Sequence, residues 1–176
     1  MLSASLTIFF VSQILPLLIL LGVLYILIRP LLSGAVYFPT AAKRVGAMVK
    51  IAGSLNGQRA ADLGSGDGRI VMALAEAGAE AHGYEVNPWL VWRSRAAVKK
   101  AGLESRAFIH WQSFWRENLS SFNLITVYGF PHMMKKLERK LHQELEPGAK
   151  VVSNIYQFPG WTPSVSENKI HLYERI

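Results

Sequence analysis

The sequence predicts an α/β domain of the Rossmann-like kind, with a doubly wound and mostly parallel β-sheet. From residue 59 onward, short apolar runs typical of strands alternate with longer runs of helical spacing. A glycine-rich turn at residues 64–68 separates the first of these strands from the first helix. Such alternation is typical of a parallel sheet with helices on both faces. About 140 of the 176 residues lie beyond residue 36, enough for one domain with its own core.

The first thirty residues have a different character. No charged side chain precedes Arg29, and Leu6 to Ile28 is a run of 23 uncharged residues. At about 1.5 Å per residue, a helix of that length spans the roughly 30 Å hydrocarbon layer. A signal peptide would have a basic start and a small-residue cleavage site, which this segment lacks. We therefore expect residues 1–33 to be a single-pass transmembrane anchor and residues 34–176 to be the functional domain.

Charge predicts the orientation of this anchor. The basic residues that follow it closely are all on its C-terminal side: Arg29, Lys43, Arg44 and Lys50. Positive flanks stay in the cytoplasm, so the domain is expected there, or in the matrix if the protein is mitochondrial. The net charge of +7 suits an anionic lipid surface, nucleic acid or an acidic partner, and beside an anchor the lipid surface is the simplest interpretation.

The remaining elements follow in order along the chain. Thr40 to Leu55 has helical spacing, with Thr40 placed to cap its start. Asn87 and Pro88 fit an N-cap followed by the first helical position, and Gly78 and Gly102 fit helix ends. The expected strands are 59–63, 79–86, 106–111, 124–128, 151–156 and one within 169–176; the expected helices are 69–77, 88–101 and 131–145.

The turn after the first strand predicts a ligand site. Asp62-Leu63-Gly64-Ser65-Gly66-Asp67-Gly68 runs from a strand end into a helix, and glycines there allow a tight turn and close approach of a ligand. Glu85 closes the next strand, where a carboxylate meets the hydroxyls of a ribose. Together these features indicate an adenosine-containing cofactor; the alternative is a tight turn that binds nothing.

Spacing and charge select the cofactor. Dinucleotide sites leave two residues between the second and third glycines to seat a pyrophosphate, whereas only Asp67 separates Gly66 from Gly68. Asp62 and Asp67 would repel a pyrophosphate and attract the sulfonium and ammonium of S-adenosylmethionine. The chain has no cysteine, which excludes thiolate metal sites, and no metal ion is expected.

These residues resemble the class I (seven-strand) methyltransferases, and among them the membrane-bound lysine N-methyltransferases that act on the adenine nucleotide translocase and the ATP synthase c-subunit. The resemblance runs from Tyr37 to Ile176. It is carried mainly by residues 62–71 (DLGSGDGRIV) and 83–90 (GYEVNPWL), with support from 37–40 (YFPT) and 146–153 (EPGAKVVS).

The resemblance implies roles for individual residues. Contacts to the methionine moiety are implied for Asp62, Gly64, Gly66 and Gly68, and a ribose contact for Glu85. Ser65 and Asn87 lie in the same two blocks and join the cofactor-binding candidates. Where relatives have an aspartate near the adenine, this chain has Ser113, so Gln112 or Ser113 is expected to take that place. Tyr37, Pro39 and Thr40 are expected to fold over the cofactor, although Tyr37 also suits a membrane interface.

The acceptor side is expected after the fourth strand, in Tyr128-Gly129-Phe130-Pro131. A lysine acceptor must lose its proton, and an apolar aromatic channel favours the neutral amine, so Tyr128 and Phe130 are expected to line that channel. Phe130 also fits a core position, and His132 is a candidate base. We expect a membrane-associated protein substrate and no nucleic acid, because a nucleobase-type Asn/Asp-Pro-Pro-Tyr/Phe motif is absent here. A small-molecule or lipid acceptor and a catalytically silent membrane adaptor stay open.

Overall fold

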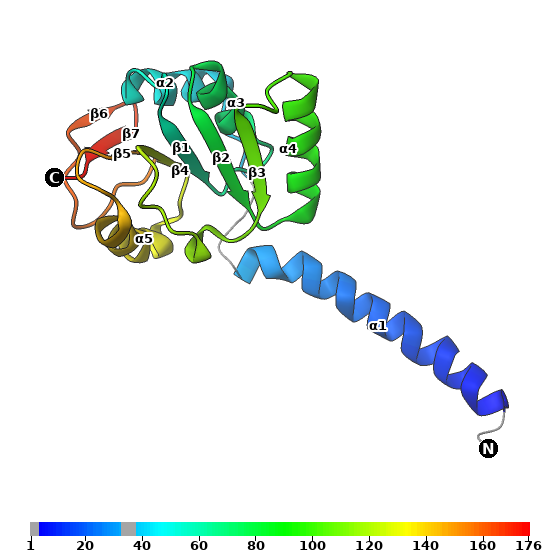
Figure 1. Cartoon of the computed structure of the whole chain (residues 1–176). Helices are drawn as coiled ribbons and strands as arrows, with labels where there is room; N and C mark the ends of the chain where they lie inside the picture. Colours follow the sequence, from blue (N-terminus) through cyan, green and yellow to red (C-terminus); the bar gives the residue numbers. More distant parts are fainter. Residues whose placement is uncertain (1–3, 33–37) are drawn as a thin grey trace. The chain divides into compact units, whose positions relative to one another are not determined.

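The computed structural model describes residues 4–32 and 38–176, and the chain divides into two compact units, Met1–Val36 and Tyr37–Ile176. Figure 1 shows the first as one long helix, α1 (Ala4–Leu32), and the second as a sheet covered by helices.

The prediction of a membrane anchor over Leu6–Ile28 was wrong. A bilayer crossing takes about 20 consecutive apolar residues. Within residues 4–32 and 38–176, no helix has the combination of length and hydropathy that such a crossing requires. The predictions of a single-pass membrane localisation and of a cytoplasmic or matrix-facing domain depended on this anchor and are therefore wrong as well.

The second unit is built on a seven-stranded mixed sheet, which confirms the predicted fold class. The strands are β1 (Arg59–Leu63), β2 (Glu80–Glu85), β3 (Ala107–Trp111), β4 (Leu124–Val127), β5 (Lys150–Asn154), β6 (Val165–Glu167) and β7 (Ile170–Glu174). Their order across the sheet is β3-β2-β1-β4-β5-β7-β6. The first five in that order are parallel, whereas β7 runs antiparallel to both β5 and β6. The strand order therefore reverses between β1 and β4, the position where open α/β sheets bind ligands.

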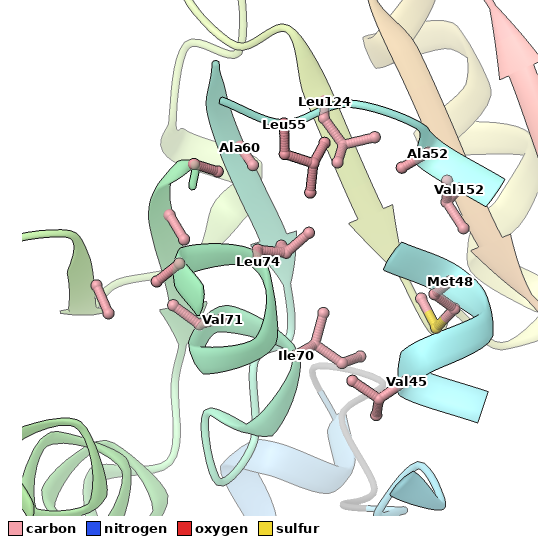
Figure 2. Close-up of a cluster of buried hydrophobic side chains, with 14 of the residues drawn as sticks. Val45, Met48, Ala52, Leu55, Ala60, Ile70, Val71, Leu74, Leu124 and Val152 are labelled. Atoms are coloured by element: carbon pink, nitrogen blue, oxygen red, sulfur yellow. The ribbon is translucent and has the colours of Figure 1, made fainter. Parts of the chain in front are cut away.

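Helices cover both faces of the sheet. One face carries α2 (Ala42–Ala52), α3 (Arg69–Glu76) and α4 (Pro88–Lys100), and the other carries α5 (Pro131–Glu144) and the short η1 (Phe114–Arg116). Figure 2 shows the first interface, where Met48 of α2 and Leu74 of α3 meet the side chains of the strands. On the other face α5 buries Met134, Leu137 and Leu141, and its C-cap residue Leu145 is buried as well. The side chains on the two faces of the strands therefore contribute to two separate hydrophobic cores, one on each side of the sheet.

The element boundaries agree with the sequence at several caps and differ at two places. The side-chain oxygen of Asn87 accepts hydrogen bonds from the backbone amides of Trp89 and Leu90 at 3.0 and 3.5 Å, which confirms it as the N-cap of α4. Thr40 is not a cap: Ala41 holds that position, and Thr40 is buried with its hydroxyl near Asn154. The hairpin β6–β7 was not predicted, because its first strand has only three residues, all exposed.

Candidate active site

The candidate site lies at the carboxyl ends of β1, β2 and β4. Register aligns Leu63 of β1 with Tyr84 of β2 on one side and with Val127 of β4 on the other. The segments that leave these strands therefore emerge together at one edge of the sheet. They are the glycine loop 64–68, Glu85 with its following turn, and the aromatic segment 128–130.

The glycine loop adopts a backbone that side chains disfavour. Gly64, Gly66 and Gly68 have φ values of +85°, +54° and +81°, in the left-handed region that glycine occupies at little cost. A Cβ at Gly64 would meet nothing within 4 Å, so the loop leaves open space there. A Cβ at Gly68 would lie 2.9 Å from the Cβ of Ser94, so that glycine allows α3 and α4 to pack closely. The first glycine therefore faces a ligand space, and the third serves packing.

Glu85 binds the glycine loop directly. Its Oε2 accepts the backbone N–H of Gly66 at 3.0 Å, and its Oε1 accepts those of Val86 and Asn87, both at 2.7 Å. A carboxylate has about four acceptor positions. Three are filled by backbone amides, which leaves capacity for a ribose hydroxyl and fixes the loop against the end of β2.

Asp62 is a buried acid beneath this loop. The residue is 2% exposed, and its Oδ1 accepts a hydrogen bond from the Thr126 hydroxyl at 2.7 Å. Burial raises the pKa of Asp62 to about 7, the Thr126 hydrogen bond opposes this, and the nearby charges of Glu85 and Asp67 raise it further. A cation near Asp62 would relieve that electrostatic cost, so the position suits a positively charged ligand group.

Asp67 is paired with a basic side chain of the protein itself. Its two carboxylate oxygens form an ion pair with Arg69, the first residue of α3, at 2.9 and 2.6 Å, so this guanidinium balances its charge. The same guanidinium donates to the carbonyl oxygen of Thr40 at 2.7 Å. Asp67 and Arg69 thus connect the glycine loop to the segment that precedes α2.

Ser65 brings a buried hydroxyl to the loop. Its Oγ has no hydrogen-bond partner among the residues that the structure describes. It packs so closely over Gly83 of β2 that a Cβ at Gly83 would lie 2.7 Å from it. A buried hydroxyl without a partner is costly unless a ligand group satisfies it.

The other cofactor candidates have varied environments. Tyr37 lies outside the described residues, Pro39 is exposed, and Thr40 is buried and joined to Asn154 of β5. Gln112 donates from its side-chain amide to Glu117 Oε2 at 2.7 Å, so that amide already has a partner within the chain. Ser113 is half-buried at the start of η1, and its hydroxyl makes no capping hydrogen bond. Of this pair, Ser113 has the more available donor and acceptor.

Aromatic rings gather at the acceptor side. Tyr128 and Phe130 are half-buried and nearly parallel, with ring centroids 6.3 Å apart and an interplanar angle of 21°. His132 is exposed and lies over Phe130 at 6.2 Å. Tyr156 lies 6.4 Å from Tyr128 at 18°.

Sequence reasoning missed three of these neighbours, namely Thr126, Arg69 and Tyr156. Thr126 carried a signal, because it is the polar residue of an otherwise apolar strand, Leu124–Val127. Arg69 directly follows the last loop glycine, two residues from Asp67. Tyr156 required knowledge of how the chain turns after β5.

The residues at this edge fit an adenosyl sulfonium. Open space lies over Gly64, Ser65 offers an unsatisfied hydroxyl, and Asp62 and Glu85 supply acidic groups for a cation and for sugar hydroxyls. With the strand order β3-β2-β1-β4-β5-β7-β6, the fold and site define the class of S-adenosylmethionine-dependent methyltransferases. Its solved members include an RNA methyltransferase from Salinibacter ruber in complex with S-adenosyl-L-homocysteine. That structure matches with a TM-score of 0.73 and 30% identity over 78% of this chain and 92% of its own.

Within that class, the chain belongs to the family defined by the ANTKMT methyltransferase domain, whose model matches residues 62–165. A lysine N-methyltransferase of the ATP synthase c-subunit from Rattus norvegicus is 41% identical over 127 residues, 72% of this chain and 58% of the relative. A protein-lysine N-methyltransferase from Saccharolobus islandicus is 33% identical over 129 residues, 72% of this chain and 80% of the relative. The chain spans little more than half the length of the mammalian relatives it matches. These matches confirm the family resemblance carried by the sequence.

Proposed function

We propose that this chain is an S-adenosylmethionine-dependent protein-lysine N-methyltransferase. The observation that carries the proposal is the shared sheet edge, where Glu85 holds the glycine loop while Tyr128 and Phe130 stand beyond the adjacent end of β4. Relatives named as lysine N-methyltransferases, one of them matched over 80% of its length, support a protein lysine as the acceptor.

This geometry supports a set of proposed cofactor-binding residues. Glu85 would accept a hydrogen bond from a ribose hydroxyl, and the loop glycines Gly64 and Gly66 would let the methionine moiety lie close to the backbone. The Asp62 carboxylate would attract the cationic end of the cofactor, and the Ser65 hydroxyl would bind a polar atom of the ligand. Ser113 is the candidate for adenine. Asn87 acts indirectly, because it caps α4 while its backbone amide binds Glu85.

The bound cofactor supplies a methyl carbon on a positively charged sulfur. The chain has to hold the acceptor nitrogen in line with that carbon and keep water away, so no protein nucleophile is required. The lone pair of a neutral lysine amine would take that methyl carbon while the sulfur kept the electron pair of the broken C–S bond. The nitrogen would then carry the positive charge, and one proton would have to leave it to restore a neutral amine for release or for another transfer.

The aromatic side chains favour the reactive form of the lysine. Tyr128 and Phe130 replace water around the amine, which disfavours the charged form and lowers its pKa from about 10.4. His132 is exposed and stacked on Phe130, and it is the proposed carrier of the departing proton to solvent. The ATP synthase c-subunit is the first acceptor to test, because it is the substrate in the names of the mammalian relatives.

RNA is a second candidate acceptor. The Salinibacter ruber relative is named as an RNA methyltransferase, and the net charge of +7 suits a polyanion. The protein acceptor is favoured because the relative from Saccharolobus islandicus is slightly more identical to the chain and is named as acting on protein lysine.

One labelling experiment separates these acceptors. The purified full chain is incubated with S-adenosylmethionine radiolabelled in the methyl group and a cell extract, and the mixture is divided into protein, RNA and lipid fractions. We expect label in protein, with N-methyl-lysine recovered after acid hydrolysis. Label confined to RNA or lipid would overturn the lysine assignment. Glu85→Ala serves as the negative control, because it removes the proposed ribose contact.

A further inference from the structure

Tyr156 follows β5 through an unusual turn. Ile155 has φ of +74°, a conformation that costs a β-branched residue free energy. The backbone amide of Tyr156 donates to the carbonyl of Asn154 at 3.0 Å, which makes a three-residue γ-turn centred on Ile155. The γ-turn with positive φ is the rare and strained form.

Several contacts hold this turn in place. The Ile155 amide donates to the Lys169 carbonyl at 2.6 Å, and His171 Nε2 lies 3.4 Å from the Ile155 carbonyl. The Ser153 hydroxyl donates to the Tyr156 carbonyl at 2.5 Å.

Asn154, which leads into the turn, is held as firmly. It is 1% exposed, and its Oδ1 accepts from Arg44 at 2.9 and 2.6 Å. A strained turn persists only where its surroundings over-determine it, and such turns gather at functional sites.

The turn places Tyr156 beside the proposed acceptor site. Because β5 pairs with β4 in parallel, with Val127 opposite Ser153, the two strands end at the same edge of the sheet. The half-buried ring of Tyr156 lies 6.4 Å from that of Tyr128 at 18°, and Tyr128 lies 6.3 Å from Phe130 at 21°. Tyr128 therefore belongs to two nearly parallel ring pairs, one with Tyr156 and one with Phe130.

From this geometry we infer that Tyr156 is the third aromatic wall of the acceptor site and that the γ-turn at Ile155 sets its position. The inference rests on the proposed lysine methylation. Aromatic faces attract ammonium groups and pack against the methylene stem of lysine. An acceptor lysine arrives as the ammonium ion, because its ordinary pKa is about 10.4. Tyr156 therefore binds the incoming side chain, with the ring face attracting the ammonium and packing against the methylene stem.

The test compares Tyr156→Ala and Tyr156→Phe in the full chain, with the detergent-solubilised ATP synthase c-subunit as acceptor. We expect Tyr156→Ala to raise KM for this acceptor roughly tenfold, the scale of a lost cation–π contact with its packing. Tyr156→Phe keeps the ring face and should stay within about threefold of the wild type. The affinity for S-adenosylmethionine, measured by calorimetry, should be unchanged in both. Trp92→Ala, which removes an exposed ring of α4, is the matched control.

The outcomes are separable. If the wild type labels the acceptor protein but Tyr156→Ala leaves its KM unchanged, the inference fails and the proposed function stands. If Tyr156→Ala lowers cofactor affinity and Tm, and Tyr156→Phe does not rescue them, Tyr156 is structural and the inference fails. If the wild type labels no protein at all, the proposed function fails, and the inference falls with it.

The turn has its own test. Ile155→Gly permits positive φ without strain, so the turn and the ring position should persist, with acceptor KM near the wild-type value and an equal or higher Tm. Ile155→Pro fixes φ near −65° and removes the amide that donates to Lys169. We expect it to raise the acceptor KM at least as much as Tyr156→Ala while cofactor affinity is kept. If Ile155→Gly raises the acceptor KM like Tyr156→Ala with cofactor affinity intact, the positioning role of the turn is refuted.

Discussion

The hydroxyl of Thr126 donates a 2.7 Å hydrogen bond to the carboxylate of Asp62, across the neighbouring strands β4 and β1. Both side chains are buried, and they lie under the glycine loop at the reversal of strand order. An acid kept there without a matched cation destabilises the empty domain, whereas a cofactor that brings positive charge would compensate it. Asp62 thus links the stability of the domain to the occupation of its site.

Asp62→Asn should stabilise the empty domain near neutral pH. The pKa of Asp62 is about 7 when folded, against an ordinary value of 3.8, so between these values the folded state binds more protons than the unfolded state. The contribution of Asp62 to stability is therefore fully present below about pH 4 and is lost as pH rises through about 7. At pH 8 the variant should be more stable by at most about 4 kcal/mol. Urea unfolding from pH 4 to 8 measures this; equal pH slopes for wild type and variant would refute it.

The same titration should govern cofactor affinity. A cationic ligand needs the ionised form of Asp62, so the Kd for S-adenosylmethionine should rise as pH falls below about 7, approaching tenfold per pH unit. Calorimetry between pH 5.5 and 8 should show this rise in the wild type. Asp62→Asn should bind more weakly at pH 8 with a flatter profile, and parallel profiles would contradict the assignment.

Glu85→Gln should weaken both the loop and the cofactor site. An amide nitrogen cannot accept the backbone N–H groups of Gly66, Val86 or Asn87, so at least one of these donors loses its partner. A lost charge-assisted hydrogen bond costs about 1.5–3 kcal/mol, so Tm should fall and the cofactor Kd should rise at least tenfold. Glu80→Gln, an exposed substitution on the same strand, should change stability by less than about 1 kcal/mol.

A double-mutant cycle isolates the ribose contact within that effect. Adenosine and 2′,3′-dideoxyadenosine are titrated into wild type and Glu85→Gln. Loss of the two hydroxyls should cost affinity in the wild type and distinctly less in the variant, because the coupling between the carboxylate and the hydroxyls has been removed. Additive effects would mean that Glu85 braces the loop without contacting the sugar.

Most of the fold was predictable from local signals. Strand and helix alternation, the Asn87 cap and the glycines at helix ends act within a few residues, and the sequence shows them directly. The short strand β6 gave no such signal. It joins β7 through Asn168 and Lys169, both at positive φ, without a glycine that would mark a two-residue hairpin. The prediction of a membrane anchor rested on the hydropathy of the apolar run before Arg29. It was wrong, because no helix in the described part of the chain meets the requirements of a bilayer crossing.

The sequence predicts only those parts of the site whose residues are close in sequence or follow adjacent strands. The glycine loop and Glu85 belong to adjacent strands whose order is fixed by a right-handed crossover, so their meeting could be expected. The pairing of Asp67 with Arg69 was missed because the loop acids were assigned to the ligand. Thr126 and Tyr156 reach the site through the register of β4 and β5, and register is set by packing across the whole sheet.

Arg69→Met should loosen the connection between the glycine loop and the segment before α2. The guanidinium bonds both Asp67 and the carbonyl of Thr40, and methionine keeps much of the apolar stem without the charge. We expect a lower Tm and a several-fold higher cofactor Kd, because the glycine loop loses the hydrogen bonds that fix Asp67 and join it to the Thr40 carbonyl. Arg69→Lys should recover part of both losses, and a variant with wild-type affinity would contradict the connection.

Gly83→Ala should distort the cofactor site although it changes none of the proposed site residues. An added Cβ would lie 2.7 Å from the Ser65 hydroxyl and 2.8 Å from a methyl carbon of Val71, closer than real Cβ atoms approach. Because Val71 is buried in the core, Ser65 has to move, and the glycine loop moves with it. Overpacking of this kind costs about 1–3 kcal/mol, so both Tm and cofactor affinity should fall. Gly46→Ala is the matched control, since its Cβ meets nothing within 4 Å in helix α2 and should stabilise by about 1 kcal/mol. If Gly83→Ala lowers Tm but leaves the cofactor Kd at the wild-type value, Ser65 does not support the binding loop.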